Sequence, residues 1–171
     1  MGAAGVTDGL VLREAVPGDE ALVLHFVRAL ADYERLAHEV RATEAMLREA
    51  LFGAAPRAQA LIAEWHGAPS GFALWFYNFS TFEGRPGLYV EDVFVAPEHR
   101  GHGIGFAMFR DLARRAVQQG CARMDWAVLD WNRPALDFYR RIGARPVAGW
   151  TGQRLTGAAL AALAAGNKGD S

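Results

Sequence analysis

Three glycines at alternate positions follow an apolar run that carries two adjacent carboxylates. The run spans residues 88–95, its carboxylates are Glu91 and Asp92, and Pro97 ends it. The segment 100–105, Arg-Gly-His-Gly-Ile-Gly, then leads directly into an amphipathic stretch with helical spacing. A strand, a glycine loop and a helix N-terminus together present bare backbone N–H groups and the positive end of the helix dipole. The sequence therefore predicts a binding site for a phosphate-bearing cofactor at this loop.

Two nucleotide-binding motifs share some of these features, and the sequence departs from both. A P-loop requires Lys followed by Ser or Thr after its last glycine, whereas Gly105 is followed by Phe106 and Ala107. A dinucleotide-binding fingerprint requires G-x-G-x-x-G, but Phe106 occupies the position of the third glycine. A simple connecting turn explains the glycines poorly, because each glycine costs conformational entropy on folding. A ligand that must approach the backbone closely is the better explanation.

Hydrophobic periodicity and turn residues indicate the elements that position this loop. We expect strands over residues 9–15, 58–65, 71–79, 88–95 and 123–129, and a final strand pair over 144–150 and 153–155. We expect helices over residues 19–36, 43–53, 103–119, 132–143 and 157–165, and a loop over 81–87. The tails 1–8 and 166–171 are expected to be disordered. This order of elements predicts a mixed α/β fold with a central sheet, in a single domain over residues 1–171.

Composition bounds the class of protein and its partners. The chain has 171 residues, of which 51% are hydrophobic and 22% charged, as in ordinary soluble globular proteins. Its net charge of −1 gives no support for nucleic acid or an anionic membrane as a partner. Cys121 is the only cysteine, so no intrachain disulfide can form, and the five histidines lack metal-ligand spacing. We find no signal peptide and no apolar stretch of membrane-spanning length, and therefore expect a cytoplasmic protein without a metal.

The segment Arg100-x-x-Gly103-x-Gly105 after a hydrophobic strand resembles the acyl-CoA signature of the GNAT acetyltransferase superfamily. Over roughly residues 10–155, further segments resemble one branch, the diamine (spermidine/spermine) N-acetyltransferases and their thialysine-acetylating relatives. These segments lie at 31–34, 51–53, 71–73, 89–95, 131–134 and 138–144. The resemblance implies the GNAT fold, in which a central, mostly antiparallel sheet splays at the acyl-CoA site and is flanked by helices. It also implies acetyl-CoA as the co-substrate and a homodimer with the acceptor site near the interface.

The resemblance further implies which residues hold acetyl-CoA. Three residues of the central strand would pair through their backbone with the pantetheine arm, as if it were an added strand: Val93, Phe94 and Val95. Four residues would line the thiol end: Asn132, Arg133, Pro134 and Ala135. The pyrophosphate would lie on the glycine loop, which comprises Arg100, Gly101, His102, Gly103, Ile104, Gly105 and Phe106.

Acetyl transfer to an amine requires two proton movements. An aliphatic amine with a pKa of ~10.4 is only about one part in a thousand neutral at pH 7, so a base assists the reaction. Adjacent strand residues face opposite sides of a sheet, so Glu91 and Asp92 are expected on opposite faces. The resemblance makes Glu91 a water-relayed base or an electrostatic anchor and Asp92 a structural group, while two structural ion pairs stay an alternative. Tyr139 matches the family's tyrosine acid for the departing thiolate; the alternative is a tyrosine with its ring in the core and its hydroxyl in water.

Acidic residues are expected to select the amine. By resemblance, Tyr33 and Glu34 match contacts to the polyamine end, and Glu83 matches an acid in the loop before the central strand. Arg85 and Gln153 stand where the family has tryptophans, which disfavours a long polycation relative to a small amine or an amino acid with a side-chain amine. We therefore predict an N-acetyltransferase for a polyamine, diamine or lysine-like amino acid. Acetylation of a protein lysine or N-terminus, and a non-catalytic acyl-CoA-binding module, stay open as alternatives.

Overall fold

A computed structural model describes residues 8–166 of the chain, which divides into two compact units, Met1–Leu129 and Asp130–Ser171. Residues 1–7 and 167–171, which hold most of the two tails expected to be disordered, lie outside the described residues.

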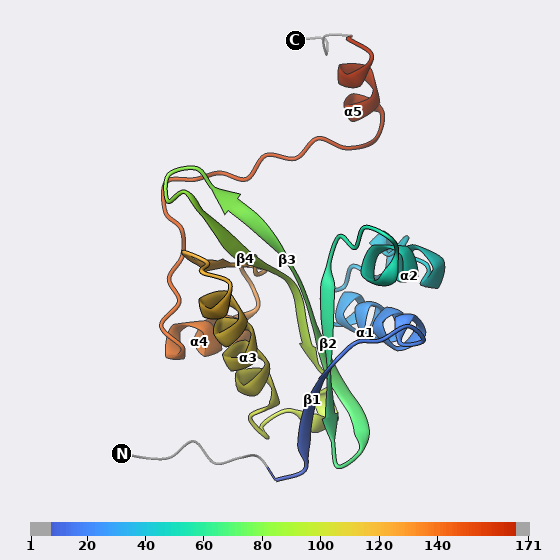
Figure 1. The fold of residues 1–171 in the computed structure, drawn as a ribbon, viewed down its shortest axis with the longest axis vertical. Helices are drawn as coiled ribbons and strands as arrows, with labels where there is room; N and C mark the ends of the chain where they lie inside the picture. Colours follow the sequence, from blue (N-terminus) through green and yellow to red (C-terminus); the bar gives the residue numbers. More distant parts are fainter. Residues whose placement is uncertain (1–7, 167–171) are drawn as a thin grey trace. The chain divides into compact units, whose positions relative to one another are not determined.

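The first unit is built on a five-stranded sheet whose strands lie side by side in chain order (Figure 1). The first four strands pair antiparallel with their neighbours, and the fifth pairs parallel with the fourth. The strands are β1 Leu10–Glu14, β2 Gln59–Trp65, β3 Ala68–Ser80, β4 Arg85–Val95 and β5 Met124–Asp125. The predicted mixed α/β class with a mostly antiparallel central sheet is confirmed.

Helices cover both faces of this sheet (Figure 1). Helices α1 (Glu20–Tyr33) and α2 (Glu44–Phe52) lie on one face, and α3 (Ile104–Gln118) lies on the other. Each face has its own core of buried side chains. The α3 side includes Trp75, Leu88, Val90, Ile104, Met108 and Leu112. The α1 and α2 side includes Val23, Phe26, Leu51, Ile62, Phe72 and Phe94.

Arg13 on β1 ties together β1, β2 and the start of α1. Its guanidinium donates to Asp19 Oδ2 at 2.6 Å and to Glu64 Oε1 at 2.7 Å. An aspartate directly before a helix commonly caps it, but the Asp19 carboxylate accepts from Arg13 and makes no capping bond to α1. The hydrogen bond from Arg13 holds the pKa of Asp19 below its usual value. The start of α1 is therefore fixed by a tertiary contact rather than by a local cap.

Removing this contact should destabilise the protein measurably. We expect Arg13→Met to lower the free energy of unfolding by about 1–3 kcal/mol at pH 7, because two charged partners lose their hydrogen bonds. Urea denaturation measures this change. A matched control is Arg123→Met, which removes an exposed pair with Asp125 and should cost less than about 1 kcal/mol. Equal losses in the two variants would contradict the role assigned to Arg13.

Several predicted strand boundaries are wrong. The β3–β4 loop is shorter than residues 81–87, because β4 begins at Arg85 and pairs there with Ser80. The strand expected over 123–129 is limited to Met124–Asp125. In the described part of the second unit no residue between 144 and 156 forms a strand, so the final strand pair is not present. A strand requires a ladder partner, and this segment is interrupted by Pro146, Gly149 and Gly152.

The two helices predicted for the second unit are confirmed. They are α4 (Arg133–Arg141) and α5 (Gly157–Ala164). No helix within residues 8–166 is both long and apolar enough to cross a lipid bilayer.

Candidate active site

Strand β4, which carries both carboxylates, contains one residue more than the segment of β3 opposite it. Leu74 pairs with Asp92 and Trp75 pairs with Val90, so Glu91 has no cross-strand partner. Such an extra residue is a β-bulge, a feature that bends a strand and redirects side chains. The bulge therefore lies at one of the two carboxylates that the sequence singles out.

The bulge places both carboxylates on the same face of the sheet. Val90 and Val93 both pack into the core on the α3 side, although they are three residues apart. Glu91 follows Val90 and Asp92 precedes Val93, so each side chain is directed away from α3 and toward the α1 side. The expectation that Glu91 and Asp92 face opposite sides is wrong, because it assumed an unbroken alternation along the strand.

A third carboxylate, Glu34 at the end of α1, acts on Asp92. Burial, together with the negative charges of Glu91 and Glu34, raises the pKa of Asp92 to about 6. Burial also raises the pKa of Glu34, which directly follows the last residue of α1. Both charged groups that act on the Asp92 pKa are carboxylates. The arrangement therefore has a negative potential that a cationic ligand would relieve.

Arg100 lies at the same end of β4. Its guanidinium carbon is 4.6 Å from the ring centroid of Tyr33 and 5.6 Å from that of Phe94. Its Nε donates to the carbonyl of Val95 at 2.9 Å. The structure thus brings Tyr33 and Glu34 of the predicted amine site close to the strand that carries Glu91.

The glycine loop leaves open space beside its backbone at the start of α3. Gly101 and Gly103 have φ values of 84° and 77°, a left-handed conformation that favours glycine, and a Cβ on either would meet no atom within 4 Å. The Ala107 N–H donates to the carbonyl of Gly103 at 2.9 Å, which is the first hydrogen bond of the helix. The N–H groups of Ile104, Gly105 and Phe106 precede that bond and have no acceptor within the helix. This cradle fits a phosphate group.

Among residues 8–166, no strand pairs with the outer edge of β4 beyond its short pairing with β5. The two strands pair at two positions, the last being Tyr89 with Asp125. Just after the last residue of β4, the Ala96 N–H donates to the Ser70 carbonyl of β3 at 2.9 Å. Because backbone groups alternate along a strand, those of Val93 and Val95 point to the opposite edge, where the Val95 carbonyl already accepts from Arg100 Nε. An extended ligand with amide groups could pair with this edge, as the sequence predicts for pantetheine.

The second unit carries the predicted residues for the thiol end and the acid. Asn132 is buried, and its side-chain oxygen accepts from the Ala135 N–H at 3.3 Å, which caps α4. Pro134 lies in the first turn of this helix, where a missing N–H costs nothing. Tyr139 is half-buried on α4, with its ring 5.6 Å from that of Phe138. Asn132 thus has a structural role at the helix start, whatever it contributes to a ligand.

Glu83 lies apart from the carboxylates near Asp92. It is exposed in the turn between β3 and β4, where its N–H donates to Ser80 Oγ at 3.3 Å. The seven residues from Arg85 to Glu91 span about 20 Å of strand. Within one chain, the structure therefore does not bring Glu83 to the amine site expected around Glu34 and Glu91.

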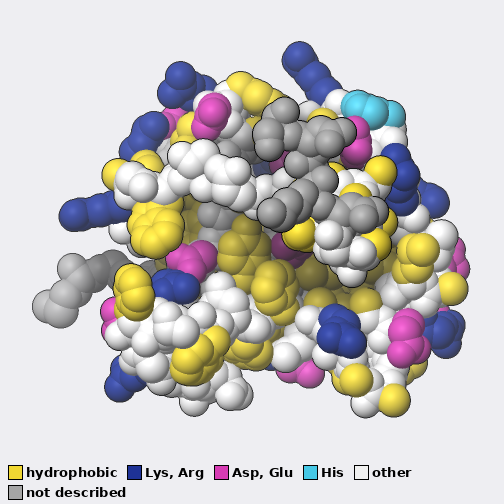
Figure 2. All heavy atoms as spheres, turned by 90° about the horizontal axis from the view of Figure 1, so that it is seen from above, with side chains coloured by type: hydrophobic (Ala, Val, Ile, Leu, Met, Phe, Trp, Pro, Cys, Tyr) yellow, Lys and Arg dark blue, Asp and Glu magenta, His cyan; other side chains and the backbone are white. Residues whose placement is uncertain are grey.

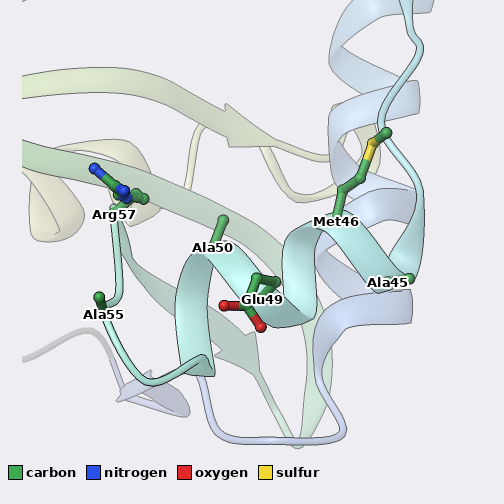
Figure 3. Close-up of a pocket in the computed structure, with 6 residues that line it drawn as sticks. All are labelled: Ala45, Met46, Glu49, Ala50, Ala55 and Arg57. Carbon is green, nitrogen blue, oxygen red and sulfur yellow. The ribbon is translucent and has the colours of Figure 1, made fainter.

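A shallow hollow beside α2 contains none of the predicted site residues. Figure 3 shows six side chains around it, from α2 and from the segment that follows: Ala45, Met46, Glu49, Ala50, Ala55 and Arg57.

Among residues 8–166 there is no group of three or more His, Cys, Asp or Glu side chains that could hold a metal ion. Basic and acidic side chains are interspersed on the face shown in Figure 2.

A comparison with protein families identifies the class of this fold. Residues 26–144 match the Acetyltransferase (GNAT) family, a stretch that contains the bulged strand, the glycine loop and α4. The chain belongs to the GNAT acetyltransferase family. As a member of this family it is an acyl-CoA-dependent N-acetyltransferase, and the resemblance found in the sequence is confirmed.

Several known proteins are similar over most of the chain. A thialysine N-epsilon-acetyltransferase of Sus scrofa is 39% identical, over 91% of this chain and 97% of its own length. A spermidine/spermine N(1)-acetyltransferase-like protein of Homo sapiens is 31% identical, over 84% of this chain and 22% of its own length. An L-ornithine N5-acetyltransferase of Arabidopsis thaliana is 28% identical, over 89% of this chain and 86% of its own length. Among solved structures, an integron cassette protein from the mobile metagenome of V. cholerae has a TM-score of 0.75 and 27% identity, over 91% of this chain and 98% of that one.

Proposed function

We propose that this acetyltransferase moves the acetyl group of acetyl-CoA to the amine of a small cationic substrate, with a lysine-like amino acid favoured over a longer polyamine. The proposal rests on three carboxylates, Glu34, Glu91 and Asp92. The two charged groups that shift the pKa of Asp92 are Glu34 and Glu91, and both are negative. A bound ammonium group would supply the missing positive charge. Two relatives are named as acetyltransferases of thialysine and of ornithine. Both of these amino acids carry an amine on a short side chain, which supports this substrate class.

The residues present fit acetyl-CoA as the co-substrate, which when bound supplies an activated acyl group. The loop from Gly101 to Phe106 would hold the pyrophosphate, since it offers open space and helix N-terminal N–H groups. The edge from Val93 to Val95, with Phe94 directed into the core, would bind the pantetheine amides. The residues from Asn132 to Ala135 would line the thiol end, as the resemblance implies. The family match crosses the boundary between the two units, which supports a single acetyltransferase domain.

The chemistry assigned to these side chains is acid–base catalysis. The amine nitrogen must lose a proton to attack the thioester carbonyl carbon, and the carbon–sulfur bond then breaks. Glu91, exposed at the bulge, would accept that proton through water, and the neighbouring Asp92 is ionised at neutral pH because its raised pKa is still only about 6. Tyr139 would donate a proton to the departing sulfur. Tyr33 and Glu34 would contact the other end of the amine.

The glycine loop can be tested with a matched pair of substitutions. Gly103 and Gly120 lie at opposite ends of α3, both have positive φ, and a Cβ on either meets no atom within 4 Å. Gly103→Ala and Gly120→Ala should therefore each lower stability by about 1–2 kcal/mol through backbone strain alone. Isothermal titration should show weaker acetyl-CoA binding in Gly103→Ala only. Equal acetyl-CoA affinities in the two variants would contradict a phosphate site at the loop.

The proposed function is tested by measuring CoA release from acetyl-CoA with separate amines. The panel contains lysine, thialysine, ornithine, diamines, spermidine and a lysine-containing peptide. We expect turnover on the small amines. Turnover on the peptide alone would favour a protein acetyltransferase, and acetyl-CoA binding without turnover on any amine would favour a binding module.

A homodimer and a cytoplasmic location stay predictions of the sequence. Light scattering coupled to size-exclusion chromatography measures the mass in solution, which should be twice that of the 18.6 kDa chain. A mass equal to one chain would contradict the predicted dimer.

A further inference from the structure

We propose that Arg100 is a positioning residue for the acceptor amine: it fixes the Tyr33–Glu34 end of α1 against the bulged strand β4. The sequence motif assigns Arg100 to the pyrophosphate of acetyl-CoA, whereas its two ring contacts connect it to the amine side and its hydrogen bond connects it to the Val95 carbonyl. The inference rests on the proposed amine site and adds a residue to its specificity.

Arg100 contacts both elements that form this site. Its guanidinium carbon lies 4.6 Å from the Tyr33 ring on α1 and 5.6 Å from the Phe94 ring on β4, while its Nε donates to the Val95 carbonyl at 2.9 Å. A planar guanidinium can stack on an aromatic ring and direct an N–H to a carbonyl at the same time. A lysine ammonium has no such planar face, so the geometry is specific to arginine.

The turn that Arg100 supports has a strained backbone. Directly after Glu34, Arg35 adopts φ of 63°, a left-handed conformation that glycine usually takes. The Leu36 N–H donates to the Ala31 carbonyl at 2.7 Å and the Arg35 N–H to the Asp32 carbonyl at 3.1 Å, which ends α1 sharply at this point. A non-glycine residue keeps such a conformation only where surrounding contacts maintain it. The Arg100 contact with the neighbouring Tyr33 ring is one of these contacts.

Arg100 is not among the charged groups that shift the pKa of Asp92 or Glu34. The charged groups that act on the pKa of Asp92 are Glu91 and Glu34, and the pKa of Glu34 is raised by burial alone. Arg100 therefore acts on Glu34 through the position of Tyr33. The negative charge of the site is left available for the amine.

The kinetic test separates the two possible roles of Arg100. We expect Arg100→Met to raise the KM for the amine about 10-fold while the Kd for acetyl-CoA, titrated without amine, changes less than about twofold. Arg100→Lys should behave like Arg100→Met, because it restores the charge without the planar contact. The control is Arg110→Met on the exposed face of α3, which should change neither constant. A rise in the acetyl-CoA Kd with an unchanged amine KM would overturn the proposal.

A second measurement does not depend on turnover. Hydrogen exchange of the amides of residues 34–36 should be at least about 5-fold faster in Arg100→Met than in the wild type or Arg110→Met. If no amine is acetylated but this exchange is faster, the proposed substrate fails and the positioning role of Arg100 stands. Unchanged exchange in Arg100→Met would overturn the positioning role, whether or not the enzyme is active.

Discussion

Replacing Tyr139 by phenylalanine is expected to lower kcat by about 10²- to 10⁴-fold, the usual contribution of a positioned acid or base. The substitution removes one hydroxyl and keeps the ring that packs beside Phe138 on α4. Because the hydroxyl would act only on the departing sulfur, acetyl-CoA affinity should change less than about twofold. Single-turnover rates and titration of acetyl-CoA measure the two effects separately.

The control for this variant is Tyr77→Phe. Tyr77 packs against the core on the α3 side of the sheet, so losing its hydroxyl should leave kcat nearly unchanged. Thermal unfolding of both variants verifies that they are folded. An unchanged kcat in Tyr139→Phe would contradict the acid role assigned to Tyr139. If the acetyl-CoA Kd instead rises by the same factor by which kcat falls, Tyr139 is a binding residue.

Asp92→Asn is expected to stabilise the protein at neutral pH and to impair use of the amine. The folded-state pKa of Asp92 is about 6, above its ordinary value of 3.8, so the folded protein binds more protons than the unfolded chain between these values. Stability therefore falls as pH rises from about 4 to about 6, and the full loss is present above pH 6. A neutral amide avoids this loss, so the gain should be about 1–3 kcal/mol at pH 7 and near zero at pH 4.

The same substitution should lower kcat/KM for a cationic amine about 10- to 100-fold, because a charged hydrogen bond contributes about 1.5–3 kcal/mol. The wild-type kcat/KM should also rise with pH through about 6, and this step should vanish in the variant. Urea denaturation at pH 4 and pH 7 measures the stability. The isosteric control is Asp125→Asn, which loses an exposed pair with Arg123 and should show no gain at pH 7. A loss of stability at pH 7 in Asp92→Asn would mean that Asp92 makes a stabilising contact.

The parts of the fold that depend on local sequence could be predicted, and the parts that depend on distant partners could not. The bounds of α2 follow from Thr43, which accepts from the Met46 N–H at 3.2 Å, and from Gly53 after its last residue. The last strands could not be predicted, because a strand forms only where another edge is available to pair with it. Residues 144–156, predicted to contain a strand pair, form no ladder.

The candidate site shows the same division. The glycine loop could be predicted because its spacing is itself the signal. The shared face of Glu91 and Asp92 could not, because the bulge exists only relative to the pairing of β4 with β3. The two carboxylates that interrupt an apolar run predict a site but not its geometry. The direction of Arg100 depends on Tyr33, which lies far earlier in the chain, so a local motif could not reveal it.

The most direct test of the central claim is a competition among acceptors in one reaction. Lysine, thialysine, ornithine, spermidine and a lysine-containing peptide are supplied at equal concentrations with limiting acetyl-CoA. Mass spectrometry then identifies the acetylated products, whose amounts report relative kcat/KM. The structure and the relatives together predict that most acetyl groups are found on the side-chain amine of an amino acid, with spermidine less acetylated. Acetyl groups found mainly on the peptide would contradict the account of this protein as a small-amine N-acetyltransferase.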